Sequence, residues 1–384
     1  MKYLMLGVFF LSVLFAQGQS KLEYTSVEIF HGDMVANYPT FPATDQPIFI
    51  LRTRMGKNLS GSEIWHRKYG YPKTGINIVV GSLGNASVLG HFGAAMFDFI
   101  LSQRLSSKLF FEEGASLGAA YFTKKYDEQT NPKNIAIGSH VTAFVNASFN
   151  LVYKLNDKND LLLGANIFHG SNSHTVIPNL GVNMPGVSIG YRYNFRSAAR
   201  VTNADSVLRY SRKPKLNVRF ALGINEQGNS VNAVNGPKYP IYLSGIFISK
   251  KFSPINRVGS GIEVWYNAGV ESYIQSHQSD FSDSRKAAWA CQYTLSNEFL
   301  FSHFSLLTQG CIYLYNPFYK SEYKNFYNGN NKAFIKTIVT AKLGVQYYFK
   351  NVIKNNDAML FIGTYVKKNF GQADFWENGI GFQF

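Results

Sequence analysis

Residues 141–153 of the chain read Val-Thr-Ala-Phe-Val-Asn-Ala-Ser-Phe-Asn-Leu-Val-Tyr, and this stretch decides the fold class. Every odd-numbered position is apolar or aromatic, whereas most even-numbered positions carry a small or polar residue. Because the side chains of a β-strand alternate between its two faces, the stretch predicts a strand with one apolar and one polar face. Such a strand suits an all-β transmembrane barrel, whose outer face meets lipid and whose lumen is polar.

The C-terminal segment shows the same alternation. One face of residues 374–384 carries Trp376, Asn378, Ile380, Phe382 and Phe384. The other face carries Glu377, Gly379, Gly381 and Gln383. A terminal aromatic residue on such a strand is the usual assembly signal of bacterial outer-membrane barrels. We therefore expect Phe384 to be read by the barrel assembly machinery.

The N-terminus has the features of an export signal. Lys2 precedes an apolar run from Tyr3 to Phe15, and Ala16-Gln17-Gly18 offers small residues for cleavage. This order predicts a signal peptide over residues 1–18. No cysteine follows it directly, which disfavours a lipid anchor, and no later run approaches the roughly 20 apolar residues that a spanning helix needs. A retained anchor helix is the alternative, although the apolar run is short for one.

The composition favours strands and excludes one class of partner. Aromatic residues make up 16% of the chain, which is typical of β-rich proteins. The formal net charge is +15, yet no basic helix, zinc spacing or aromatic RNA-binding motif is present, so nucleic acid is not an expected partner. Basic loops that face lipopolysaccharide phosphates, or simply soluble loops, account for the charge. Cys291 and Cys311 are expected to be free thiols rather than a disulfide across a hairpin.

Sixteen segments show strand-like alternation, and about 14 to 16 of them are expected to form strands. They fall at residues 22–31, 46–55, 74–83, 88–104, 108–122, 139–154, 159–171, 182–195, 215–226, 239–253, 258–277, 285–301, 304–318, 333–350, 357–370 and 374–384. Their length disfavours a soluble β-sandwich, whose strands rarely exceed about 10 residues.

The chain divides into halves at residues 19–195 and 216–384, separated by a polar, basic linker or turn at 196–215. The halves end alike, in Gly-Tyr-Arg-Tyr-Asn-Phe at 190–195 and Gly-Ile-Gly-Phe-Gln-Phe at 379–384. Duplication of an eight-strand unit is therefore plausible. One large barrel is favoured over two small ones. A sheet closed into one barrel has no exposed edge strand, which would be unfavourable in lipid, although two separate barrels would have none either.

A short motif near the centre of the chain suggests chemistry. His169, Ser171 and Asn172 form a His-x-Ser-Asn tetrad, and His and Ser two apart on a strand share one face. Such a pair can act as general base and nucleophile for acyl transfer. Taken alone the tetrad is weak, and a histidine at a loop rim without chemistry is the common explanation.

The alternation puts this pair on the lipid-facing side. It continues an apolar row made of Leu161, Leu163, Ala165 and Ile167. Counting back along the apolar face of the next strand from Phe195 reaches Asn183, which is expected on the same side. Periplasmic turns are short and the chain ends on that side, so the strand that ends at Ser171 runs outward. The pair would then face the outer leaflet, where acyl chains of lipid A are the obvious substrate.

On these residues the chain resembles the lipid A 3-O-deacylase, or acyloxyacyl hydrolase, family of outer-membrane β-barrel enzymes. The shared pattern is His169-x-Ser171-Asn172 followed by Pro178-Asn179-x-Gly181. The longer relatives of Bacteroidetes-type bacteria are similar in further segments, at Trp65, Tyr69, Tyr71-Pro72-x-x-Gly75, residues 123–138 and Ala373-Asp374-Phe375. The core resemblance covers about residues 25–195. The second half resembles only the long relatives and has no His-x-Ser copy.

The resemblance implies a serine esterase that removes an acyl chain from lipid A and needs no metal or cofactor. It makes Ser171 the nucleophile and His169 the base. It gives Asn172 and Asn179 roles in shaping the site, with Asn179 as a candidate oxyanion donor.

Three lysines are candidates for holding the phosphates of lipid A. Lys124, Lys125 and Lys133 fall in a loop that is expected to be extracellular. A loop whose lysines are merely solvated is equally compatible with the sequence.

Asn183 departs from the family pattern, in which a glutamate orients the histidine. Asparagine can accept a hydrogen bond from imidazole but supplies no charge, and the corresponding loss in serine proteases costs about 10⁴ in rate. Asp98, Glu112 and Glu113 are candidates for a replacement acid. A non-catalytic barrel with a decayed site, either a channel or a structural protein, is therefore the alternative function. A soluble lectin-like β-protein is a weaker one.

Overall fold

The computed structural model describes residues 22–195, 210–228, 236–277, 281–327, 331–369 and 372–384. The predicted signal peptide at 1–18 lies outside these residues, as does most of the predicted linker at 196–215.

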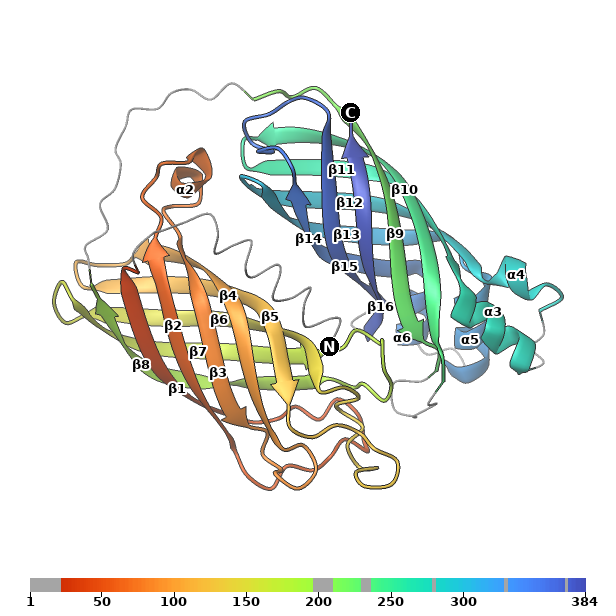
Figure 1. Ribbon diagram of the computed structural model, residues 1–384, viewed down its shortest axis with the longest axis horizontal. Helices are drawn as coiled ribbons and strands as arrows, with labels where there is room; N and C mark the ends of the chain where they lie inside the picture. The colour runs from red at the N-terminus through yellow and green to blue at the C-terminus, as the bar shows by residue number, and fades with distance from the viewer. Residues whose placement is uncertain (1–21, 196–209, 229–235, 278–280, 328–330, 370–371) are drawn as a thin grey trace. The chain divides into compact units, whose positions relative to one another are not determined.

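The described chain contains two closed antiparallel barrels of eight strands each (Figure 1). The first consists of β1 (Tyr24–Gly32), β2 (Ile48–Asn58), β3 (Lys73–Ser82), β4 (His91–Arg104), β5 (Leu109–Phe122), β6 (Val141–Lys154), β7 (Asn159–Ser171) and β8 (Val182–Asn194). The second consists of β9 (Lys215–Glu226), β10 (Lys238–Ser253), β11 (Asn256–Asn267), β12 (Trp289–Phe301), β13 (Phe304–Tyr315), β14 (Val339–Tyr348), β15 (Met359–Asn369) and β16 (Gln372–Gln383).

The all-β class and the strand number are confirmed, but the preference for one large barrel is wrong. β8 pairs with β1, from Tyr24 opposite Asn194 to Gly32 opposite Gly186, and so closes the first set of eight. β16 pairs with β9 and closes the second set. Each closure satisfies its own sheet edges, so neither barrel needs strands from the other half of the chain.

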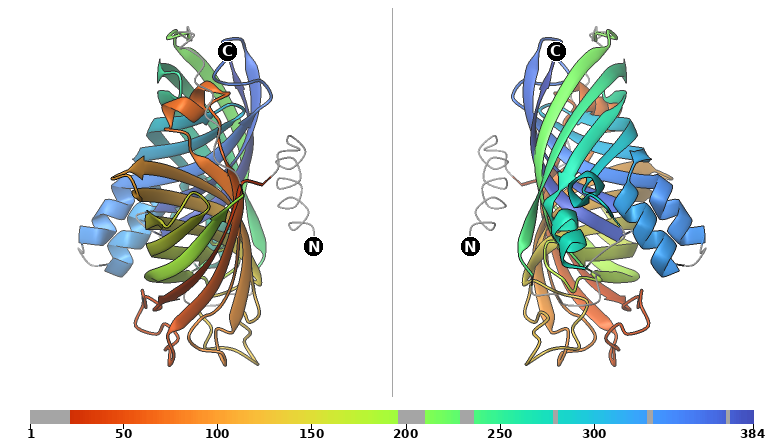
Figure 2. Two further views of the ribbon diagram at one scale, coloured as in Figure 1. Left: turned by 90° about the vertical axis from the view of Figure 1, so that its left-hand side faces the viewer. Right: turned by 90° about the vertical axis from the view of Figure 1, so that its right-hand side faces the viewer.

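Several predicted strands are too long because helices occupy the connections between strands. Within the described residues the helices are α2 (Ile64–Lys68), α3 (Ala268–Ser276), α4 (Ser284–Ala287), α5 (Pro317–Tyr327) and α6 (Asn331–Ile338). The Asn267 side chain accepts the backbone N–H groups of Gly269 and Val270 and thereby starts a helix where alternation predicted more strand. Helices α3 to α6 gather at one end of the second barrel (Figure 2). In the described part of the chain, no helix is long and apolar enough to cross a membrane.

The outer walls are apolar, as the alternation predicts. Phe149, Leu163 and Ile189 are exposed by 50%, 59% and 66% although they lie in the middle of their strands. Such a continuous exposed apolar band is unfavourable in water and suits lipid.

The interior of the first barrel is filled, and the prediction of a polar lumen is correct for only one half of it. Toward the Asn194 end, Arg52 and Arg54 pair with Glu28, and Arg54 Nε lies 3.0 Å from Asp98 Oδ2. Toward the Ser171 end, the filling is a core of aromatic rings, namely Phe30, Phe92, Phe122, Phe144 and Phe168. An eight-stranded barrel is narrow enough for side chains alone to fill it.

The second barrel also buries ion pairs. Lys342 Nζ lies 2.8 Å from Glu263 Oε2 and 2.6 Å from Glu377 Oε1. Cys291 and Cys311 are free thiols, as the sequence predicts. Cys291 lies opposite Tyr315 and Cys311 opposite Thr294, so the two do not face each other.

The buried ion pair of Glu112 predicts a large effect on stability. Glu112 Oε2 lies 2.6 Å from Arg192 Nη2, and Lys73 pairs with the same carboxylate. Glu112→Ala leaves Arg192 and Lys73 inside the barrel without this counter-charge, so the free energy of unfolding should fall by about 3–5 kcal/mol. The measurement is urea unfolding in lipid vesicles, followed by tryptophan fluorescence. Glu113→Ala, on the opposite face of the same strand, is the control and should shift stability by only about 0.5 kcal/mol. Equal shifts for the two variants would contradict a role for the interior pairs.

Candidate active site

The His169 motif lies on the outer wall of the first barrel, where β7 ends and β8 begins. Leu161, Leu163 and Ile167 of β7 are exposed, and the even-numbered residues between them are buried. His169 and Ser171 continue the outward row and are half-buried. His169 lies directly opposite Asn183 in the β7–β8 pairing, so the three side chains share the outer face.

The site lies at the end of the barrel that has the longer connections. At this end, strands are joined through residues 33–47, 83–90, 123–140 and 172–181. At the other end they are joined through residues 59–72, 105–108 and 155–158. Long connections belong to the extracellular side of bacterial barrels and short ones to the periplasmic side. The motif is therefore at the outer end of its strand.

His169 is oriented by Asn183. The His169 Nδ1 atom lies 2.8 Å from the Asn183 Oδ1 atom. An amide oxygen can only accept, so this hydrogen bond requires the proton on Nδ1. In this tautomer Nε2 carries the lone pair, which is the form of imidazole that a general base needs.

Ser171 receives a hydrogen bond from Asn179. Asn179 Nδ2 donates to Ser171 Oγ at 2.9 Å, and the backbone N–H of Asn172 donates to Asn179 Oδ1 at 3.3 Å. The second bond fixes which end of the amide faces the serine. The Asn172 side chain is buried and donates to Ser139 Oγ at 3.3 Å. An amide donor beside a hydroxyl nucleophile can stabilise negative charge that develops there.

Gly181 lies against His169 and Ser171, and another residue at this position would be strained. Its φ is 72°, a conformation that favours glycine. A Cβ at this position would lie 2.9 Å from the carbonyl oxygen of Gly170, 3.4 Å from Ser171 Cβ and 3.5 Å from His169 Cε1. The Gly181 N–H donates to Ala136 O at 3.0 Å, which ties this turn to the 123–140 connection. The sequence marked Gly181 only as part of a motif, because a close approach across a turn leaves no local pattern.

A row of small side chains leads to Ser171 along the outer wall. Ser171 lies opposite Ala143, Ala143 opposite Ala119, and Ala119 opposite Ala95. Ala95 and Ala119 are exposed and Ala143 is half-buried. Sequence reasoning missed this row because it depends on the register of four strands. It leaves a shallow apolar surface beside the serine.

The replacement acids considered from the sequence do not serve His169. Asp98 and Glu112 point into the barrel, where they pair with arginines. On β5, Leu117 is the residue level with His169. Glu113 lies four residues before Leu117, a distance of about 13 Å along the strand. The hydrogen-bond partner of His169 Nδ1 is the amide of Asn183.

The three candidate lysines are exposed in the 123–140 connection. Lys124 Nζ donates to the carbonyl oxygen of Ser87 at 2.5 Å. Lys133 lines an open hollow with Tyr38 and Phe41 of the 33–47 connection. All three are at the same end of the barrel as Ser171.

Other family-like residues lie away from the site. Trp65 and Tyr69 belong to the α2 region at the opposite end of the barrel, where both rings pack against Phe99. Asp374 lies in β16 of the second barrel, where it pairs with Lys367 at 2.9 Å. Among the residues that the structure describes, no group of three or more His, Cys, Asp or Glu side chains could hold a metal ion.

Comparison with known proteins gives two family matches. The family model for lipid A 3-O-deacylase (PagL) matches residues 51–192, and the model for the C-terminal domain of acyloxyacyl hydrolase matches residues 214–384. No curated protein matches the chain.

Solved outer-membrane barrels are similar only at low identity. Neisserial surface protein A is 12% identical with a TM-score of 0.32, over 45% of this chain and 96% of that protein. An outer-membrane channel from Pseudomonas putida F1 is 9% identical with a TM-score of 0.18, over 95% of this chain and 96% of the channel.

Proposed function

Because the chain belongs to the lipid A 3-O-deacylase family of outer-membrane hydrolases, we propose that it is a serine esterase that removes an acyl chain from lipid A in the outer leaflet. The observation that carries the proposal is the arrangement on the outer wall. His169 is held by Asn183 through Nδ1, and Ser171 Oγ accepts a hydrogen bond from Asn179. All of these side chains lie at the extracellular end of a lipid-facing wall.

The proposed reaction has two steps. His169 Nε2 takes the proton of Ser171 Oγ as this oxygen attacks the ester carbonyl carbon, and the Asn179 amide stabilises the oxyanion. Collapse of the intermediate breaks the ester bond, and the sugar oxygen leaves with the proton from His169. Water then attacks the acyl-enzyme with His169 again acting as base. A free fatty acid is released and Ser171 is restored.

The surroundings of the pair fit an amphiphilic substrate. An acyl chain can lie along the row of Ala143, Ala119 and Ala95, since small side chains leave room beside Ser171. The phosphates of lipid A would lie above, where Lys124, Lys125 and Lys133 are exposed.

A non-catalytic outer-membrane barrel is the second candidate. It is favoured by the neutral Asn183, which supplies no charge for the imidazolium that forms during attack. The filled interior of the first barrel and the buried ion pairs inside the second favour a structural protein over a channel within this alternative.

The proposal also assigns roles in export and in membrane assembly to segments outside the active site. Residues 1–18 would direct the chain out of the cytoplasm, residues 19–195 would carry the activity, and residues 216–384 would form a supporting barrel after a linker at 196–215. Phe384 would be the assembly signal. It is 54% exposed, its backbone N–H donates to Leu216 O at 2.8 Å, and its ring packs on Phe382.

Removing the nucleophile or the base tests the reaction. Ser171→Ala and His169→Ala should each lower deacylation by about a thousandfold or more, because the two side chains act as a unit. The measurement is mass spectrometry of lipid A from cells that express each variant at equal level. Ser87→Ala, an exposed loop serine at the same end, is the control and should behave as wild type. A wild-type chain that removes no acyl group retained in the variants would leave only the non-catalytic function.

Adding a charge at position 183 tests the orienting residue. Asn183→Asp keeps the size of the side chain and places a carboxylate against His169 Nδ1, so it should raise the deacylation rate at least about tenfold. Asn183→Leu has a similar shape without an acceptor and should lower the rate. Initial rates on purified lipid A in detergent are the measurement. If Asp and Leu give the same rate as Asn, residue 183 does not orient the base.

Changing the terminal residue tests assembly. Phe384→Ser should reduce the amount of heat-modifiable, folded protein in outer-membrane fractions severalfold. Phe382→Ser, on the same face two residues earlier, is the matched control and should have a smaller effect. Equal yields of wild type and Phe384→Ser would rule out a role for the terminal ring.

A further inference from the structure

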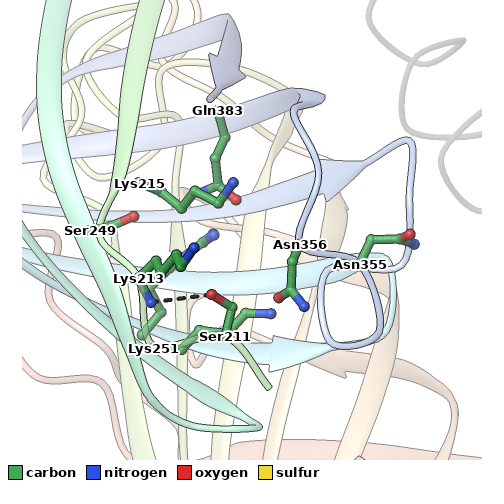
Figure 3. A pocket seen from close by; sticks show the side chains of 9 residues that line it. Ser211, Lys213, Lys215, Ser249, Lys251, Asn355, Asn356 and Gln383 are labelled. Carbon is green, nitrogen blue, oxygen red and sulfur yellow. Dashed lines mark hydrogen bonds between the residues drawn. The ribbon is translucent and has the colours of Figure 1, made fainter. Parts of the chain in front are cut away.

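The second barrel has a cationic mouth at the end opposite α3 to α6. A small hollow there is lined by Lys213, which precedes β9, by Lys215 at the start of β9, by Lys251 of β10 and by Arg257 of β11. Figure 3 shows the three lysine side chains gathered at this opening together with Ser211, Asn356 and Gln383. The side chains that line the hollow are cationic or neutral, and none is acidic.

Two of these cations are buried at directly paired positions. Lys251 lies opposite Arg257 in the β10–β11 pairing, and the two residues are only 8% and 2% exposed. Lys215 lies opposite Ser249 on the neighbouring pair of strands and is half-buried. Like charges directly opposite each other in a sheet are destabilising, and burial strengthens the repulsion.

Acidic side chains in the described residues neutralise only part of the positive charge at the mouth. Arg257 Nη2 lies 2.6 Å from Glu298 Oε2. Lys251 Nζ donates to the carbonyl oxygens of Val352, at 2.6 Å, and Ile353, at 3.4 Å, which carry no net charge. Within the described residues, Lys213, Lys215 and Lys251 form no ion pair. A buried ammonium without a counter-charge is costly, so the mouth is arranged for an anion from outside the chain.

We propose that this mouth binds a phosphate group. Three ammonium groups and a guanidinium line one hollow, and the Asn356 amide beside them is a neutral donor. A tetrahedral group with several acceptor oxygens and up to two charges matches such a set better than a single carboxylate.

The mouth faces the periplasm by the same rule that places the active site outside. At this end, strands are joined through residues 254–255, 302–303 and 349–358. At the other end they are joined through residues 227–237, 268–288, 316–338 and 370–371, so the longest connections are there. The phosphate can therefore come from a phospholipid headgroup of the inner leaflet or from free phosphate. This site is separate in sequence and chemistry from Ser171 and does not depend on the proposed reaction.

The test uses the full chain in a phosphate-free maltoside detergent with two probes. Inorganic phosphate is titrated calorimetrically at constant ionic strength. Phosphatidylglycerol and uncharged diacylglycerol are compared as retained adducts by native mass spectrometry. The variant is Lys215→Gln/Lys251→Gln, and Lys250→Gln is the matched control because this exposed lysine precedes Lys251 on the other face of β10. Lys213→Gln, at an exposed position, provides a second variant that should not disturb folding.

The double variant should weaken binding at least about tenfold, the loss expected for a charge-assisted hydrogen bond, while Lys250→Gln binds as wild type. Lys213→Gln should weaken it less. If inorganic phosphate binds in the calorimeter but no phosphatidylglycerol adduct is retained, free phosphate is the ligand. Retained phosphatidylglycerol without retained diacylglycerol identifies the headgroup. Binding that is absent from wild type, or equal in wild type and both mouth variants, overturns the proposal.

Discussion

Closure of the sheet is the constraint on which the first barrel depends. β1 must pair along its whole length with β8, because an unpaired strand edge in hydrocarbon costs several kcal/mol for each exposed backbone group. The approach is close where Gly32 meets Gly186, since a Cβ on either residue would lie 2.3 Å from a carbonyl oxygen of the neighbouring strand. Eight strands closed in this way leave an interior that side chains fill completely.

A filled interior determines where chemistry can occur. The ion pairs of Glu28 and Glu112 and the aromatic core around Phe144 leave no space for a lipid inside the barrel. An apolar substrate must therefore meet the protein on its outer wall. His169 and Ser171 occupy outward positions, and the alternation that makes Leu163 and Ile167 face lipid makes these two polar residues face it as well. Polar side chains are expensive there, which is a physical reason to regard them as functional.

Local patterns predicted the parts of the fold that local forces decide. The alternation at 141–153 predicted strand β6 and its lipid-facing side, and the same reasoning assigned His169, Ser171 and Asn183 to one face before their register was known. Pairing partners are not local. Nothing near Asn194 in the sequence says that its strand returns to Tyr24 rather than continuing into β9, so the two closures were missed. The alanine row at 95, 119 and 143 was missed for the same reason, because it exists only once four strands are aligned. Helix α3 was not predicted, although Asn267 is a good N-cap, because the predicted strand was extended past Asn267 to residue 277.

The site itself depends on the direction of one neutral hydrogen bond. With Asn183 Oδ1 toward His169 Nδ1, the imidazole carries its proton on Nδ1 and Nε2 can act as a base. If the amide turns over, its NH₂ group donates to Nδ1, the proton moves to Nε2, and base catalysis is lost. A carboxylate has no such second orientation, because both of its oxygens accept. Asn179 differs in this respect, since the Asn172 N–H holds its amide oxygen and keeps its NH₂ toward Ser171. The amide that donates to Ser171 is therefore held in one orientation, whereas the amide that accepts from His169 Nδ1 can reverse. In the proposed reaction, an asparagine at 183 would make the fraction of molecules with a competent base depend on a rotamer equilibrium.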